Sequence, residues 1–113
     1  MALKVLYAGV EYEHYNPGEG LSFEYNNFYS ALRAMEGVEV VYYPFDMILE
    51  LGKAEYNRKL LNLVRQERPQ VFFSFMYTDE LDSRVLKEIQ NLTISIAWFA
   101  DDYWRFFNYS KEW

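Results

Sequence analysis

Residues 71–76, VFFSFM, form a short run that is apolar on both faces of an extended strand. A strand of this kind is buried on both sides, as in a parallel sheet covered by helices. Three similar runs occur at residues 3–9 (LKVLYAG), 38–43 (VEVVYY) and 93–98 (TISIAW). Segments with helical spacing of apolar residues separate the four runs. The sequence therefore predicts an α/β fold in which strands and helices alternate.

Three helices are expected between the strands. The first follows Ser22, a suitable N-cap, and stops at Gly37, a suitable C-terminal cap. Its inward face is predicted to hold Phe28, Ala31, Leu32 and Met35. The second helix is expected over residues 53–68, because Pro69 disfavours helix at the residue before it.

The third helix is predicted to be capped by Thr78 or Asp79 and to run to the start of the last strand. Its inward face is expected to hold Leu81, Val85, Ile89 and Leu92. The last strand alternates apolar and small residues, which predicts a less enclosed position. A short helix over residues 101–109 is expected to follow it.

Right-handed crossovers turn this pattern into half of a doubly wound sheet with helices on both faces. The predicted architecture is a three-layer, Rossmann-like or flavodoxin-like half with four parallel strands in the order 2-1-3-4. The order 3-2-1-4 remains an alternative, because a helix pattern does not identify strand neighbours.

Length and charge limit the classes of protein. The chain has 113 residues, a net charge of −6 and no cysteine, which fits a single domain over residues 1–113 and excludes cysteine-based sites. The acidic balance argues against nucleic acid as a partner. The start lacks the pattern of a signal peptide, and no apolar run approaches the roughly 20 residues that span a membrane. We therefore expect a cytoplasmic protein without a membrane span.

Ligands of open α/β sheets bind beyond the carboxyl ends of the strands. The residues expected there are rich in acids and aromatic rings: 11–20, Asp46, 77–80 and 99–104. Gly9, Gly18 and Gly20 lack the spacing of a dinucleotide-binding loop, and the neighbouring glutamates would repel phosphate. A phosphoacceptor receiver domain is disfavoured as well, because strand 71–76 does not end on an aspartate.

Two features of this rim allow a chemical and a structural interpretation. His14, the sole histidine, is a candidate general base, although a lone loop histidine is more often simply solvated. Asp101 and Asp102 are able to bind a divalent cation, but capping of the terminal helix is the simpler role. No metal site is predicted.

Aromatic residues are unusually frequent, at 20% of the chain, and eight of them lie between Trp98 and Trp113. A folded chain does not leave so apolar a terminus in water without a reason. We expect it to be covered by a ligand, by another subunit or by a further part of the protein. Beside carboxylates, aromatic rings also suit sugars, whose hydroxyls bind carboxylates while ring faces cover their apolar surface.

Three stretches together resemble a known family: residues 20–28 (GLSFEYNNF), 43–46 (YPFD) and 98–106 (WFADDYWRF). They are similar to the N-terminal domain of GT-B glycosyltransferases, and most similar to the spore-maturation-protein-like group. The resemblance implies a two-domain enzyme with the acceptor on the N-terminal domain and a nucleotide-sugar donor on the C-terminal one. It also implies that this chain is the acceptor-side part, binds no cofactor itself and does not transfer sugar alone.

The partner implied by the resemblance is a glycan or small-molecule acceptor. The acceptor-binding residues expected on this basis are Glu11, Tyr12, Glu13, Tyr15, Gly18, Gly20, Glu24, Asn27, Tyr77, Asp79, Trp98, Asp101 and Asp102. Strand 93–98 would then expose an edge, so self-association through that edge and the aromatic terminus is expected. The alternative function is a non-catalytic α/β regulatory or protein-interaction domain, such as a diverged receiver-like module.

Overall fold

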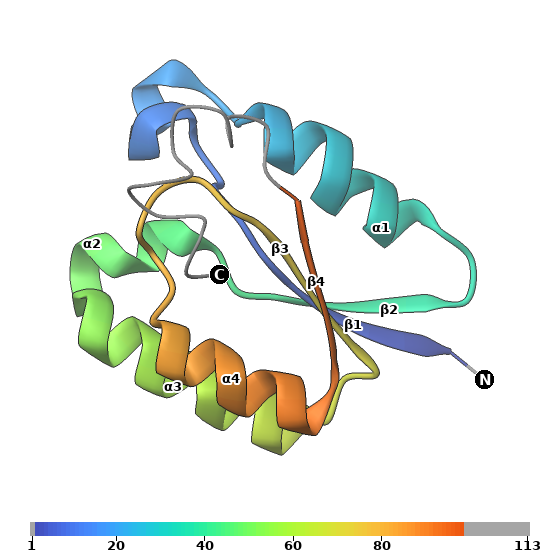
Figure 1. The fold of residues 1–113 in the computed structure, drawn as a ribbon. Helices are drawn as coiled ribbons and strands as arrows, with labels where there is room; N and C mark the ends of the chain where they lie inside the picture. The colour runs from blue at the N-terminus through green and yellow to red at the C-terminus, as the bar shows by residue number, and fades with distance from the viewer. Residues whose placement is uncertain (1, 99–113) are drawn as a thin grey trace.

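The computed structural model describes residues 2–98, so the predicted helix over 101–109 lies outside the described residues. Four strands, β1 (Leu3–Ala8), β2 (Val38–Tyr42), β3 (Val71–Phe75) and β4 (Ile94–Trp98), form one parallel sheet. Their order is β2-β1-β3-β4, which confirms the 2-1-3-4 arrangement of a Rossmann-like half (Figure 1). No helix within this part of the chain is long and apolar enough to cross a membrane.

Helices cover both faces of the sheet, as predicted (Figure 1). One face packs on α3 (Lys53–Glu67) and α4 (Ser83–Leu92), where Leu6, Phe72 and Ile89 are fully buried. The other face packs on α1 (Ser30–Ala34) and on the π-helical segment Tyr25–Tyr29 that precedes it. The two central strands, β1 and β3, therefore supply the core of the molecule.

The first helix is confirmed, but its inward face matches the predicted one only in part. Phe28 packs on rings of the sheet as predicted, and Tyr25 and Tyr29 do so as well, whereas Ala31 and Met35 are exposed. The π-helical turn is the reason, because it adds a residue to the turn and shifts the phase of every later position. The helix ends at Ala34, so Gly37 lies in the turn beyond it, with a φ of +79°.

The third helix begins later than predicted. Asp82, and neither Thr78 nor Asp79, caps α4 through a hydrogen bond from the backbone N–H of Arg84 (2.8 Å). Thr78 instead donates to Glu80. Leu81 is buried as expected, although it lies in the loop before the helix.

The segment between β2 and α3 is short and helical. It contains a 3₁₀ turn (Phe45–Met47) and α2 (Ile48–Leu51), and Gly52 joins it to α3 with a φ of +79°. The second helix ends at Glu67, one residue before the predicted boundary. Arg68 caps it in the left-handed conformation.

Candidate functional site

The loop after β1 is tied to the end of β2 by one carboxylate. Asp46 accepts hydrogen bonds from the backbone N–H groups of Glu11 (2.7 Å) and Tyr12 (3.1 Å). Burial, and secondarily the nearby Asp46 charge, raises the pKa of the Glu11 carboxyl above its usual value. The buried Ser22 hydroxyl closes the loop by donating to the Val10 carbonyl (2.5 Å). These bonds fix where the loop crosses the carboxyl edge of the sheet.

Two consecutive residues of this loop adopt a conformation that side chains rarely take. His14 has a φ of +51° and Tyr15 a φ of +60°. Each such residue costs about 1 kcal/mol or more, and the surrounding structure must hold it there. Here the hydrogen bonds from Tyr15 N to Tyr12 O (2.9 Å) and from Asn16 N to Glu13 O (2.9 Å) do so. This backbone turn carries the Tyr15 side chain to the loop that follows β3.

The phenol of Tyr15 ends on a buried carboxylate. Glu80 is only 5% exposed and accepts hydrogen bonds from Tyr15 Oη (2.5 Å), from Thr78 N (2.7 Å) and from Thr78 Oγ1. Burial, followed by the Glu80 charge, raises the pKa of the Tyr15 phenol far above its ordinary value. Tyr15 is therefore a permanent hydrogen-bond donor to Glu80 at any physiological pH.

The buried side-chain amide of Asn57 in α3 is hydrogen-bonded to the β3–α4 loop, which contains Glu80. Asn57 is 2% exposed, and its Nδ2 donates to the carbonyls of Lys53 and Glu80 (2.9 Å each). Its Oδ1 accepts from the backbone N–H of Asp82 (2.8 Å). All of the bonding capacity of the side chain is used within the protein, apart from a second lone pair on the oxygen. Asn57 thus fixes the β3–α4 loop between β3 and the cap of α4.

A cavity of about 350 Å³ opens between these segments. Its volume lies within the range of small-ligand sites. The lining residues come from the segments that follow β1, β2 and β3: Tyr15, Ile48, Lys53, Thr78, Asp79 and Glu80. The chain leaves β1 toward β2 and leaves β3 toward β4, so the cavity lies at the switch point of the sheet, where α/β proteins bind ligands.

The exposed rim of this switch-point cavity combines one cation and one anion. Lys53 Nζ and Asp79 Oδ2 are 3.0 Å apart, and both side chains remain about half exposed. The ring of Tyr15 meets that of Tyr77 edge to face, with centroids 5.9 Å apart. The site therefore offers donors, acceptors and an aromatic wall to a ligand.

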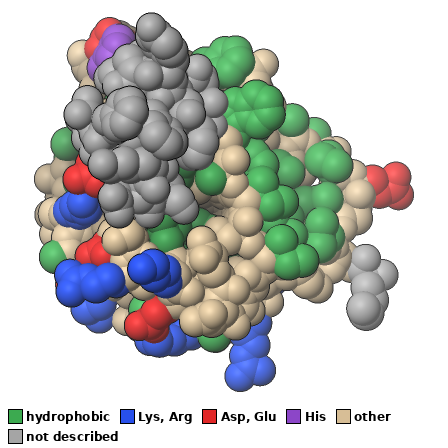
Figure 2. Space-filling view, in the orientation of Figure 1, with side chains coloured by type: hydrophobic (Ala, Val, Ile, Leu, Met, Phe, Trp, Pro, Cys, Tyr) green, Lys and Arg blue, Asp and Glu red, His purple; other side chains and the backbone are tan. Residues whose placement is uncertain are grey.

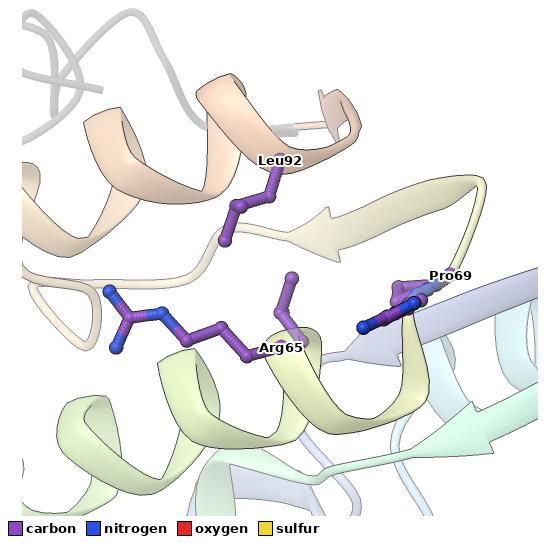
Figure 3. A pocket seen from close by; sticks show the side chains of 5 residues that line it. Arg65, Pro69 and Leu92 are labelled. Atoms are coloured by element: carbon purple, nitrogen blue, oxygen red, sulfur yellow. The ribbon is translucent and has the colours of Figure 1, made fainter.

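A second cavity, of about 410 Å³, lies between the C-terminal ends of α3 and α4 and is shown in Figure 3. It is lined by Val64, Arg65, Arg68, Pro69 and Leu92. Arg65 pairs with Glu88 (2.8 Å), and helix ends rich in carbonyl groups attract arginines without any ligand. This cavity is also at the amino edge of the strands, so we assign no site to it.

The structure brings only part of the predicted acceptor set to the switch-point cavity. Tyr15 and Asp79 line it, and Tyr77 contacts the Tyr15 ring. Glu11 and Tyr12 instead donate hydrogen bonds from their backbone N–H groups to the Asp46 carboxylate. Contact of Tyr15, Tyr77 and Asp79 with a ligand remains a prediction.

Other predicted residues have local roles in the loop and the first helix. Glu13 accepts from the backbone N–H of Phe23 (2.9 Å), where the helix begins. Gly18 and Gly20 lie in an exposed turn that the Asn16 side chain stabilises by accepting from Gly18 N (3.0 Å).

The first helix holds two more of the predicted residues. The carbonyl of Glu24 faces the Tyr7 hydroxyl (3.5 Å), and the amide of Asn27 donates to the carbonyl of Phe23 within the helix (2.9 Å). Neither side chain is among those that line the switch-point cavity.

The remaining predicted residues lie elsewhere. The imidazole of His14 is exposed and pairs with Glu19 (Nδ1 to Oε1, 3.1 Å), away from the lining of the cavity. Trp98 packs against Phe28 on the α1 face of the sheet. Asp101 and Asp102 lie outside the described residues.

The predicted acceptor-binding set does not contain Lys53, Thr78 and Glu80, which line the cavity, although residues 77–80 were expected at this edge of the sheet. A signal for this part of the site exists in α3, where Asn57 stands among the apolar positions of a helix. A polar side chain on a buried helix face usually meets specific hydrogen-bond partners. Here those partners belong to the loop that builds the cavity.

Among residues 2–98, no three histidine, aspartate or glutamate side chains come together so that they could hold a metal ion. Comparison of the chain with protein-family models, with curated proteins and with solved structures gave no match. The resemblance to glycosyltransferases therefore stays a prediction.

Proposed function

We propose that this chain is the acceptor-binding portion of a glycosyltransferase and that it binds a sugar acceptor in the switch-point cavity. The observation that supports this most is the composition of the cavity, in which Tyr15 provides an aromatic wall beside Asp79, Lys53 and Thr78. Sugars need such a mixture, because their hydroxyls pair with charged groups while their C–H faces pack on rings.

The electrostatics of the site favour an acceptor over a nucleotide-sugar donor. A donor diphosphate needs cations or helix N-termini around it. The cavity has one lysine, already paired with Asp79, and the carboxylate of Glu80 at its base. In this proposal the donor is bound elsewhere in the intact enzyme, and this chain alone transfers no sugar.

Within the site, Asp79 and Lys53 are the groups proposed to contact ligand hydroxyls, because both are exposed at the rim. Glu80 and Tyr15 position the loops, since they are already bonded to each other. His14 keeps its predicted role as a base only if the reacting hydroxyl extends from the cavity to the exposed end of the β1 loop.

Isothermal titration calorimetry tests this proposal with glucose, galactose, N-acetylglucosamine, their β-linked disaccharides and UDP-glucose as probes. We expect at least one of the sugars to bind and UDP-glucose to bind no better than the free sugar. Asp79→Asn should weaken sugar binding roughly tenfold, as loss of one charged hydrogen bond does. Glu88→Gln, which alters an exposed ion pair on α4, should leave it unchanged.

Tight binding of UDP-glucose, together with no detectable binding of any of the sugars, would overturn the proposal. Equal sugar binding by wild type and Asp79→Asn would refute the assigned site.

A non-catalytic protein-interaction domain is a second candidate, and one observation favours it. The large apolar side chains of β4 are about half exposed, which is typical of a surface that meets another protein. The same calorimetric panel separates the two candidates, because an interaction domain has no need to bind any of the sugars.

A further inference from the structure

Within residues 2–98, strand β4 is an edge of the sheet and its outer side pairs with no other strand. Its register with β3 runs from Val71↔Ile94 to Phe75↔Trp98, and no strand among residues 2–98 lies on its other side. Residues 93–98 contain no charge and no proline, and β4 contains no bulge. Charges, prolines and bulges are the features by which proteins normally prevent an edge strand from pairing with another chain, and β4 has none of them.

The backbone groups of β4 that remain unpaired can be identified from its hydrogen bonds. Ile94 N donates to Gln70 O (3.3 Å), and Trp98 O accepts from Met76 N (2.8 Å). Because the N–H and C=O groups of successive strand residues point to opposite sides, Ile94, Ile96 and Trp98 face β3. Ser95 and Ala97 therefore direct their N–H and C=O groups outward.

The side chains of β4 on the α1 face are apolar and poorly covered. Ile94 is 65% exposed, Ile96 45% and Trp98 53%. Figure 2 shows hydrophobic side chains gathered along this side of the molecule, over α1 and the edge of the sheet. Phe28 packs on Trp98, but α1 does not extend across the rest of β4.

We infer that β4 pairs antiparallel with β4 of a second copy of this chain, around a two-fold axis at Ile96. In this arrangement Ser95 and Ala97 of one copy exchange their N–H and C=O groups with Ala97 and Ser95 of the other. Ile96 then faces its own counterpart, and Ile94 faces Trp98. Such opposed side chains on one face of a sheet lie about 5 Å apart and pack on each other.

Charge and area both agree with a second copy as the occupant. The chain carries a net charge of −6, but the uncharged β4 brings no like charges together. The three apolar side chains and the strand backbone offer roughly 400 Å² per copy. The total, on the order of 800 Å², is that of a weak interface that forms at high concentration.

Sedimentation of the full chain from about 10 µM to about 500 µM tests this pairing, over the range in which weak interfaces form. Wild type should shift from monomer to dimer as its concentration rises. Ile96→Lys, which places two like charges at the axis, should raise the dissociation constant at least tenfold. Leu49→Lys, at an exposed apolar position on α2 away from the sheet edge, should leave it unchanged.

Ser95→Pro provides a second variant that removes one outward N–H and no bond to β3. It should also abolish the dimer while keeping the thermal melting curve of the monomer. Monomer at every concentration, or a dimer that persists in both β4 variants, would overturn the inference. So would protection of the Ser95 and Ala97 amides from hydrogen exchange in the dilute monomer, because another part of the same chain would then cover the edge.

Discussion

Individual tyrosines show how differently the same side chain is used in this molecule. Tyr43 and Tyr56 stack with ring centroids 4.5 Å apart, and each hydroxyl donates to the carbonyl of the other residue (3.0 Å). The buried hydroxyl of Tyr42 has no hydrogen-bond partner among residues 2–98. Burial raises the pKa of all three phenols. Their rings stabilise the core, whereas their hydroxyls contribute unequally.

Because the two hydroxyls differ in hydrogen bonding, the same Tyr→Phe substitution should change the free energy of unfolding differently at these neighbouring positions. Tyr43→Phe removes a buried hydrogen bond and should lower the free energy of unfolding by about 1 kcal/mol. Tyr42→Phe removes a buried hydroxyl without a partner and should leave it unchanged or raise it by up to about 1 kcal/mol. Urea denaturation of both variants measures the difference, and a larger loss for Tyr42→Phe would contradict it.

At the site, Tyr15 and Asp79 were identifiable from sequence, because loops after parallel strands meet at one edge. The burial of Glu80 was not identifiable, since it depends on the left-handed turn at His14 and Tyr15. Histidine is somewhat enriched in this conformation, but a single loop histidine does not predict two consecutive left-handed residues. Only the hydrogen bonds of the assembled loop hold it in place.

Among the elements, α4 shows how a cap decides where a helix begins. Asp82 accepts from the backbone N–H of Arg84, and this bond is the main cause that lowers the pKa of the Asp82 carboxyl. A lowered folded-state pKa means that the carboxylate stabilises the fold above its unfolded pKa. The contribution is lost as the pH falls through the folded-state value.

Asp82→Ala should therefore lower the free energy of unfolding by about 1 kcal/mol at pH 7. Its deficit relative to wild type should shrink as the pH falls from about 4 through the lowered folded-state pKa of Asp82, because the wild-type carboxylate becomes protonated over that range. Denaturation at several pH values checks this, with Glu88→Ala on the same helix as a control expected to change stability by less than about 0.5 kcal/mol. A deficit that stays constant down to pH 2 would contradict the role of the charge.

The strands were predictable to within a residue or two, because their apolar runs are short and bounded by turn residues. The helix starts were less predictable. Thr78, Asp79 and Asp82 are all good caps by residue type, and the choice depends on Asn57, which binds the loop up to Asp82. The phase of the first helix was not predictable either, since a π-helical turn has no simple sequence signal.

At the scale of the whole molecule, the hydrophobic pattern and the handedness of crossovers predict a parallel α/β sheet, and the structure has the order β2-β1-β3-β4 and not the alternative 3-2-1-4. The face toward α3 and α4 is buried at the central strands β1 and β3, whereas the large apolar side chains of β4 on the face toward α1 are about half exposed. The aromatic residues on the second face, from Tyr7 to Trp98, form a continuous set of ring contacts through Phe73 and Phe28. Part of the aromatic excess is thus core, and part lines the exposed edge.

The same topology brings the segments that follow β1, β2 and β3 together around the switch-point cavity. Its position follows from the strand order alone, and its chemistry from Tyr15, Lys53 and Asp79.

Chemical-shift mapping of the backbone amides, during titration with N-acetylglucosamine and its β-linked disaccharide, tests whether a sugar binds in the switch-point cavity. We expect saturable shifts at Tyr15, Lys53 and residues 78–80, with little change along α4 beyond its first turn. Shifts confined to the cavity between the ends of α3 and α4, or no saturable shifts around the switch-point cavity, would contradict this expectation.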